Sequence, residues 1–214
     1  TRPRVGRRGL ELVEMLEQAG CRYARIAAVA LDRPDRMVAT NDRQGAIEVA
    51  QYLLSLGHRH VGLITGPQRY LSTRERGGGF LQEMAHGGAP LPPALVLEGG
   101  YTFESGVACA EKLLALRPHP TAIFALNDDM AAGVYKTALR LGLGVPGDVS
   151  IVGFDDSPMA SRLWPSMSTV RLPIRDMGMT AAAMLLADDS APRTAPTITP
   201  HLIVRESCAP PASA

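Results

Sequence analysis

The sequence predicts an α/β fold built on a parallel sheet, and one strand–helix–strand unit carries most of that prediction. Thr121–Leu126 is a short, unbroken apolar run, which is typical of a strand buried on both faces of such a sheet. Asn127 then supplies a helix N-cap, and apolar residues recur on one face of the predicted helix Asp128–Leu141. Glycines and a Pro-Gly pair end this helix, and Val149–Phe154 is predicted to form the next strand.

Both predicted strands are followed by a polar residue, Asn127 after the first and Asp155 after the second. In open parallel sheets the ligand crevice lies outside the carboxyl ends of the strands. An amide and a carboxylate there can accept hydrogen bonds from the hydroxyls or amines of a small polar ligand. The alternative is that Asn127 only caps its helix and Asp155 forms a turn with Ser157 and Pro158. The local pattern by itself favours this alternative.

The composition describes an ordinary globular protein. Of the 214 residues, 46% are hydrophobic and 20% are charged, which is enough apolar material for a real core. The net charge of +1 produces no overall basic field, so the composition does not indicate nucleic-acid binding. No run of about twenty apolar residues occurs, which argues against a transmembrane helix and a membrane partner.

Neither the cysteines nor the histidines indicate a metal site. Cys21, Cys109 and Cys208 are widely spaced and odd in number, which fits reduced thiols in a cytosol better than a disulfide framework. His58 and His60 are separated by one residue at the end of a predicted helix. We expect them to lie in an exposed polar loop.

The remaining elements follow from apolar periodicity and from capping and breaking residues. The segment Thr1–Gly9 holds four arginines without an apolar period, and we expect it to be irregular, with a basic arm contacting DNA as the alternative. The other expected elements are a helix from Leu10 to Gly20, strands Arg25–Leu31 and Met37–Thr40, a helix from Asn41 or Asp42 to Gly57, strand Val61–Thr65, helix Thr73–Met84, strand Leu95–Leu97, helix Glu104–Leu116, strand Ser168–Arg171, a helix from Pro173, a linker Ser190–Pro196 and strand Ile198–Val204.

Three consecutive glycines, Gly77 to Gly79, fall inside the predicted helix Thr73–Met84. Three glycines cost a helix roughly 2–3 kcal/mol relative to alanine. Another requirement must therefore outweigh helix propensity, and close packing of this helix on a neighbour or a ligand is one candidate.

Three ordered motifs resemble the effector-binding core of the LacI/GalR family of transcriptional regulators. Thr121–Gly133 matches the family's strand–helix junction around Asn-Asp, Val145–Asp156 matches its Val-Gly-Phe-Asp-Asp strand, and Ser168–Gly178 matches its Thr-Val…Pro…Met-Gly segment. The resemblance covers about Leu10 to Arg205. It reverses the local interpretation of Asn127 and Asp155, because the family uses these positions to hold its effector.

The resemblance implies a two-lobed, periplasmic-binding-protein-like type I fold with flavodoxin-like parallel sheets. The partial N-terminal lobe is expected to comprise residues 1–39 and 172–197, the C-terminal lobe residues 40–171 and 198–206, and a flexible tail residues 207–214. Family members normally begin with a helix-turn-helix head, a hinge helix and two strand–helix units that this sequence does not show. We therefore expect a truncated first lobe and strong dimerisation or strand exchange.

The resemblance also implies six ligand-binding residues, which are Ser72, Arg76, Tyr101, Phe103, Asn127 and Asp155. The fork of Arg76 is expected to bind hydroxyls or a carboxylate in a bidentate way, unless it belongs to a solvated face. Tyr101, with Phe103 as a second candidate, is expected to stack on the apolar face of a sugar or base, unless it caps the core. Leu172 replaces the family's usual glutamine, which suggests a more apolar patch and puts transferred sugar chemistry in doubt.

The implied function is that of a ligand-responsive regulator core without catalytic activity, cofactor or metal. A sugar-like effector would bind between the lobes and change the geometry of a homodimer. Operator DNA would be contacted only through a head domain absent from this chain, and the protein would be cytoplasmic. The alternative is a periplasmic sugar-binding protein of an ABC transporter, which shares the two-lobed fold.

The third hypothesis is that the protein is an enzyme. The acidic pairs Asp128-Asp129 and Asp155-Asp156 follow adjacent strands, and carboxylates at such an edge could hold Mg²⁺. However, no serine, cysteine or lysine stands in a recognisable activating context. Helix capping also explains Asp128 and Asp129. We therefore favour the regulator.

Overall fold

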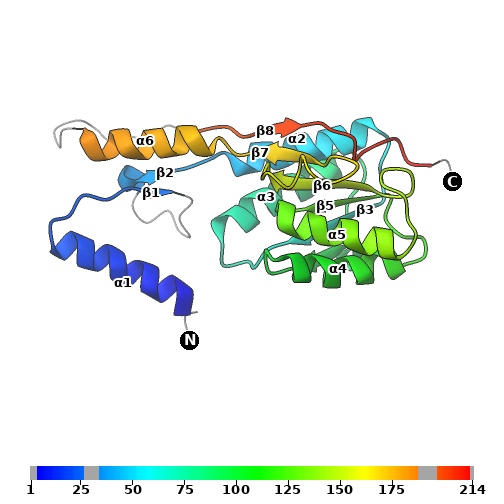
Figure 1. Cartoon of the computed structure of the whole chain (residues 1–214), viewed down its shortest axis with the longest axis horizontal. Coiled ribbons are helices and arrows are strands. Elements are labelled where there is room, and N and C mark those ends of the chain that lie inside the picture. The colour runs from blue at the N-terminus through cyan, green and yellow to red at the C-terminus, as the bar shows by residue number, and fades with distance from the viewer. Residues whose placement is uncertain (1–3, 27–33, 188–196, 213–214) are drawn as a thin grey trace. The chain divides into compact units, whose positions relative to one another are not determined.

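The computed structural model describes residues 4–26, 34–187 and 197–212, and the side chains of the first helix only from residue 11 onward. These residues form two compact units, unit 1 with residues 1–40 and 173–198, and unit 2 with residues 41–172 and 199–214 (Figure 1). Each boundary between the two units lies one residue from the boundary expected between the two lobes, and residues 207–214 belong to unit 2 instead of forming a separate tail. Most of the expected strand Arg25–Leu31 and the whole linker Ser190–Pro196 fall outside the described residues.

Unit 2 is an α/β sandwich around a six-stranded sheet with the order β4-β3-β5-β6-β7-β8. The first five strands run parallel, and β8 pairs antiparallel with β7. The strands are β3 (Val61–Thr65), β4 (Val96–Glu98), β5 (Ala122–Ala125), β6 (Ser150–Asp155), β7 (Ser168–Arg171) and β8 (His201–Ile203). This topology confirms the predicted parallel α/β fold.

Two pairs of helices cover the two faces of this sheet. Helices α2 (Asp42–Ser55) and α3 (Leu71–His86) pack together, and α4 (Phe103–Ala115) packs against α5 (Asp128–Arg140) (Figure 1). Right-handed crossovers explain this division, because the chain steps from β3 to β4 in one direction and from β4 through β5 to β6 in the other. A short 3₁₀ turn (Pro93–Leu95) precedes β4.

The core of unit 2 consists of the strands that the sequence marks as continuously apolar. Every residue of β3 and of β5 is buried, as expected for central parallel strands. Phe80 and Phe124 are fully buried and pack with their ring centroids 4.9 Å apart. Three polar residues cap helices of unit 2 through their side chains, with Asn41 before α2, Thr102 before α4 and Asn127 before α5.

The glycines of α3 satisfy a packing requirement. A Cβ atom on Gly79 would lie 2.6 Å from the backbone oxygen of Arg43 in α2, so no larger residue fits without separating the two helices. The expected close packing of this helix on a neighbour is therefore confirmed for Gly79.

Unit 1 is smaller and consists of helix α1 (Arg4–Gln18), a 3₁₀ turn (Pro34–Arg36), two short parallel strands and helix α6 (Ile174–Leu186). Strand β1 (Arg25–Ile26) pairs with β2 (Met37–Val38), and Val38 packs on Met177 and Ala181 of α6. The expected irregular segment Thr1–Gly9 is helical from Arg4 onward, so this expectation is wrong there. Arginine is a good helix former, and α1 continues through Gly6 and Gly9. Within the described ranges, no helix is long and apolar enough to span a membrane.

The C-terminal segment is held in place, which contradicts the flexible tail expected from residue 207. The buried Ser207 hydroxyl donates to the Ile151 carbonyl at 2.6 Å, and the backbone nitrogen of Ile151 donates to the Ser207 carbonyl at 3.0 Å. The Ala209 carbonyl lies 2.9 Å from the Nε2 atom of His58. His58 is 1% exposed, so the expected exposed loop is wrong at this residue. Hydrogen bonds to β6 therefore fix Ser207 and Ala209, whose sequence context gave no sign of them.

Candidate functional site

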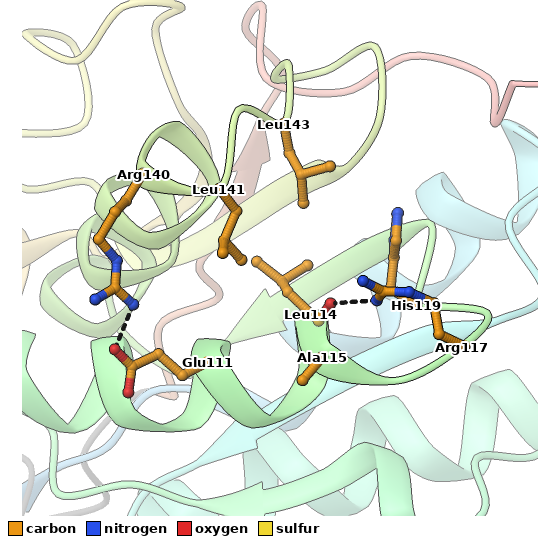
Figure 2. Close-up of a pocket in the computed structure, with 8 residues that line it drawn as sticks. All are labelled: Glu111, Leu114, Ala115, Arg117, His119, Arg140, Leu141 and Leu143. Carbon is orange, nitrogen blue, oxygen red and sulfur yellow. Dashed lines mark hydrogen bonds and ion pairs between the residues drawn. The ribbon is translucent and has the colours of Figure 1, made fainter.

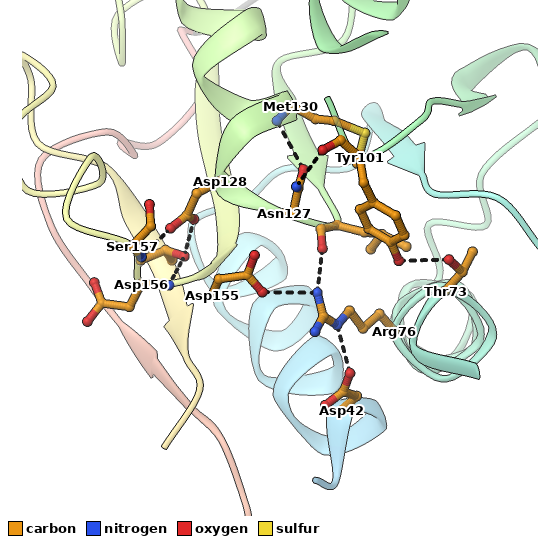
Figure 3. Close-up of polar contacts among 12 residues, drawn as sticks. Asp42, Thr73, Arg76, Tyr101, Asn127, Asp128, Met130, Asp155, Asp156 and Ser157 are labelled. Carbon is orange, nitrogen blue, oxygen red and sulfur yellow. Dashed lines mark hydrogen bonds and ion pairs between the residues drawn. The ribbon is translucent and has the colours of Figure 1, made fainter. Parts of the chain in front are cut away.

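Polar side chains gather at the carboxyl ends of β5 and β6, on unit 2 (Figure 3). Asp155 is the last residue of β6, Leu126 follows β5, and Asp42 opens α2. Arg76 reaches this edge from the second turn of α3. The crossover topology brings these four residues together because every parallel strand delivers its carboxyl end to the same edge.

Arg76 lies at the centre of the cluster and is 7% exposed. Its Nε donates to the Asp42 carboxylate at 2.8 Å, and its Nη1 donates to the Leu126 carbonyl at 2.7 Å and to Asp155 Oδ1 at 3.3 Å. The guanidinium carbon lies 3.7 Å from the centroid of the Phe154 ring, so one face of the group is covered. Nη2 makes no hydrogen bond within the described part of the chain, and no contact is drawn to it (Figure 3).

Asp155 occupies an unusual backbone conformation, with a φ angle of 123°. A residue with a side chain rarely adopts this conformation, and such strain concentrates at functional sites. The strand ends here and turns its carboxylate toward Arg76, while the side chain keeps 36% of its surface exposed. Asp155 therefore presents a partly exposed carboxylate beside the Nη2 donor of Arg76.

Burial raises the pKa of the Asp155 carboxyl to about 7, although the Arg76 guanidinium opposes this effect and the nearby Asp128 carboxylate adds to it. The folded state consequently binds a proton that the unfolded state has already released, over the range from about pH 4 to pH 7. The free energy of unfolding falls as the pH rises through this range, and the loss is complete above pH 7.

Asp155→Asn is expected to remove this loss of stability. The variant and the unsubstituted protein should have similar melting temperatures near pH 4. The difference in favour of the variant should increase toward pH 7 and stay constant above it. Thermal unfolding over a pH series measures the difference. Asp156→Asn is the matched control, because ion pairs lower the pKa of Asp156 and its loss should destabilise the protein at neutral pH. An advantage of Asp155→Asn that stays constant with pH would contradict the prediction.

Tyr101 and Asn127 line the adjoining part of the edge, and both make contacts within the protein. The Tyr101 hydroxyl lies 2.7 Å from the Thr73 hydroxyl, and the ring packs edge-on to Tyr70 with centroids 5.9 Å apart. Asn127 Nδ2 donates to the Tyr101 carbonyl at 3.1 Å, while Oδ1 accepts from the Met130 amide at 3.0 Å. Asn127 thus caps its helix and holds the Tyr101 backbone, so a ligand contact from it stays a prediction.

The other two predicted site residues lie at different places. Ser72 is a partly buried residue in the first turn of α3. Phe103 begins α4 and lines a separate pocket of about 650 Å³, where Lys136 Nζ lies 5.4 Å from its ring centroid. The structure therefore groups Arg76 and Asp155 with Tyr101 and Asn127, and it places Phe103 in a pocket that includes none of these four.

The remaining carboxylates near the site have structural partners. Asp128 is buried and accepts from the Ser157 amide and the Thr169 hydroxyl, both at 2.6 Å. Burial raises the pKa of its carboxyl, although these hydrogen bonds oppose the effect. Asp156 accepts from Arg171 at 2.5 Å and from Arg205 at 2.6 Å. Among the described residues, no group of three or more acidic, histidine or cysteine side chains is arranged to hold a metal.

Sequence reasoning missed the part that Asp42 and Thr73 play in the site. Asp42 was considered only as a helix cap, yet its carboxylate binds Arg76 with both side chains 8% exposed. The position of Asp42 in the sequence could have indicated this role. It directly follows the cap Asn41, and a helix that starts at the ligand-binding edge of the sheet can direct an acidic side chain of its first turn toward that edge. Thr73, which is 1% exposed, had no distinguishing pattern.

A second pocket, of about 430 Å³, lies at the C-terminal ends of α4 and α5 (Figure 2). Its cations have local partners, because Arg140 pairs with Glu111 and Arg117 donates to the Leu114 carbonyl at 3.0 Å. Cations at helix C-termini commonly satisfy the last carbonyls in this way. An ion pair between α5 and α4 therefore accounts for Arg140 and Glu111, and a contact to the end of α4 accounts for Arg117.

A parallel sheet whose strand ends gather a buried arginine and a strained aspartate is the arrangement of a ligand-binding domain, and residues 50–208 match the periplasmic binding protein-like domain family. The chain is 35% identical over 163 residues to the probable HTH-type transcriptional repressor ExuR of Bacillus subtilis, covering 76% of this chain and 49% of that protein.

Solved structures extend the comparison. A LacI family transcriptional regulator from Mycobacterium smegmatis is 31% identical, with a TM-score of 0.81 over 94% of this chain and 74% of that one. A LacI family regulator from Enterococcus faecium with bound ribose is 25% identical, with a TM-score of 0.82 over 93% of this chain and 75% of that one. The chain belongs to the LacI family of transcriptional regulators. It spans about half the length of the curated relatives that it matches.

Proposed function

We propose that this chain is the effector-sensing core of a LacI-type transcriptional regulator, and that it binds a sugar or sugar derivative at the carboxyl ends of β5 and β6. The observation that carries the proposal is the buried Arg76, whose Nη2 donor is left over beside the partly exposed Asp155 carboxylate. One donor and one acceptor side by side suit a pair of neighbouring hydroxyl groups. The ribose bound by the Enterococcus faecium relative supports a sugar.

The proposed role of the site is to bind rather than to react. Asp155 would accept a hydrogen bond from one ligand hydroxyl, and Arg76 would donate to another oxygen. Its burial and three fixed partners hold the guanidinium in one orientation before a ligand arrives, which reduces the entropy lost on binding. Transcriptional regulators are not enzymes, and the relatives compared above are regulators.

A thermal-shift screen tests this proposal, with ribose, cellobiose, glucose and sugar acids as probes. A ligand at 100 times its dissociation constant should stabilise the folded state by about 2.7 kcal/mol, which is roughly 5–10 °C for a protein of this size. Asp155→Ala should abolish the shift. If Mg²⁺ alone stabilised the protein and Asp155→Ala removed that effect, a metal site would replace the sugar site.

The proposed partners are operator DNA, through a helix-turn-helix domain outside this chain, and a second copy of the same protein. The proposed compartment is the cytoplasm, where a regulator meets its operator. The names of the curated relatives support the regulator over the periplasmic transport protein, since they are helix-turn-helix regulators. Ligand binding would then change the DNA affinity by favouring one arrangement of the dimer.

The exposed apolar face at the end of α5 is the surface that we propose for the second copy. Trp164 is 87% exposed and Leu139 80% exposed, and both line the pocket that contains Phe103. Large apolar side chains exposed together mark interaction surfaces, and a twofold dimer buries the same patch on both subunits. Trp164→Ser with Leu139→Ser is expected to weaken dimerisation at least tenfold in sedimentation experiments. Leu186→Ser, which alters an 85% exposed leucine of unit 1, is the control.

A further inference from the structure

The charge balance around Arg76 bears on which ligands the proposed site can accept. Two carboxylates contact this one guanidinium, Asp42 at 2.8 Å and Asp155 at 3.3 Å. A third carboxylate, that of Asp128, is close enough to Asp155 to raise its pKa. The described part of the site therefore holds more negative than positive charge.

Asp42 contacts the guanidinium of Arg76 through Nε alone, and no contact is drawn to Nη2, the nitrogen left for a ligand (Figure 3). Both side chains are 8% exposed, so water screens this pair weakly. Asp42 can therefore compensate the charge of Arg76 while Nη2 is still available to donate to a ligand.

We propose that Asp42 sets the charge class of the ligand: by neutralising Arg76, it makes the site select uncharged, hydroxyl-rich molecules and reject carboxylates and phosphates. The inference rests on the proposed function and specifies its ligand class. An uncharged arginine–carboxylate pair still donates a hydrogen bond through Nη2, which is what a hydroxyl needs. An anion needs net positive charge to offset the loss of its own hydration, and the described residues of the site do not supply it.

The hydrogen-bond geometry leads to the same selection. Carboxylates and phosphates are bound best by two parallel donors of one arginine. Nε already donates to Asp42 and Nη1 to Leu126 and Asp155, which leaves a single donor nitrogen, Nη2, whose two N–H bonds diverge. The bidentate contact expected from the sequence therefore has no pair of parallel donors available. The contact that remains suits one oxygen of a neutral ligand.

Asp42→Asn is the decisive substitution, because it removes the charge and retains the shape. Inorganic phosphate and the pair glucose and glucuronate are the probes, and isothermal titration gives their dissociation constants. In Asp42→Asn we expect phosphate to bind at least tenfold more tightly than to the unsubstituted protein, and the preference for glucose over glucuronate to fall at least tenfold. The gain in phosphate binding should disappear in the double variant Asp42→Asn/Arg76→Gln.

Glu111→Gln is the matched control, because it removes a carboxylate from another arginine, Arg140, outside the site. It should leave phosphate binding unchanged. The unsubstituted protein also tests the inference if Asp42→Asn does not fold. Phosphate that binds it at submillimolar concentration, and is lost in Arg76→Gln, would overturn the inference.

The phosphate result is independent of the sugar result. If no sugar binds but phosphate gains affinity in Asp42→Asn, the charge compensation stands and the sugar proposal fails. If a sugar binds and glucuronate binds the unsubstituted protein as tightly as glucose, the sugar proposal stands and the charge inference fails.

Discussion

Arg76→Ala is expected to destabilise unit 2 by about 3–5 kcal/mol and to abolish ligand binding. The substitution leaves the Asp42 carboxylate buried without the guanidinium that binds it at 2.8 Å, and removal of one member of a buried ion pair has this cost. It also removes the contact to the Leu126 carbonyl and the cover over the Phe154 ring. Urea unfolding followed by circular dichroism measures the change.

Arg74→Ala is the control for this loss. Arg74 is two residues closer to the start of α3, is exposed and donates to the Gln68 carbonyl at 2.9 Å, so its removal should change the free energy of unfolding by less than about 0.5 kcal/mol. An effect of Arg76→Ala as small as that of Arg74→Ala would show that the cluster does not stabilise the fold. The site would then depend on some other arrangement of these residues.

Gly106→Ala is expected to destabilise unit 2 by about 2 kcal/mol. A Cβ atom on Gly106 would lie 2.2 Å from the Met130 carbonyl oxygen, which belongs to the backbone of α5 and cannot rotate away. Overpacking of this kind typically costs about 1–3 kcal/mol, and the better helix propensity of alanine offsets up to about 1 kcal/mol. Thermal and urea unfolding measure the effect. The α4–α5 contact also positions Asn127 at the start of α5.

Gly147→Ala provides the comparison, because the added Cβ would meet nothing within 4 Å. At a position whose backbone a side chain tolerates, this substitution is neutral or stabilises by up to about 1 kcal/mol, since it restricts the unfolded chain. Similar losses for Gly106→Ala and Gly147→Ala would indicate that the close α4–α5 packing is not what makes the first glycine necessary.

The sequence predicted the sheet of unit 2 well because its central strands are buried on both faces. Such strands appear as continuous apolar runs, and the expected bounds of β3 and β7 agree with the structure. The cap Asn127 was predicted correctly for a related reason. A side chain that bonds the backbone within its own first turn leaves a local pattern in the sequence.

The predictions that were wrong or missed concern residues whose environment depends on contacts between segments far apart in the chain. His58 is buried because its ring bonds the Thr121 hydroxyl and the Ala209 carbonyl, neither of which its neighbours in sequence reveal. The same holds for Asp42, whose partner Arg76 lies 34 residues away. A polar residue that is buried against a partner far away in the chain has the same local sequence pattern as a surface residue, so only the folded structure distinguishes the two.

The hydrogen bonds between residues 207–209 and β6 bear on when the protein can fold during its synthesis. Strand β8 and this segment belong to unit 2, and unit 1 likewise needs residues 173–198 to return to residues 1–40. A nascent chain that has emerged only as far as residue 172 therefore exposes two incomplete units. Domains usually fold as they emerge. Here residues 173–209 close both units, so neither unit can complete its fold until this stretch of chain has left the ribosome.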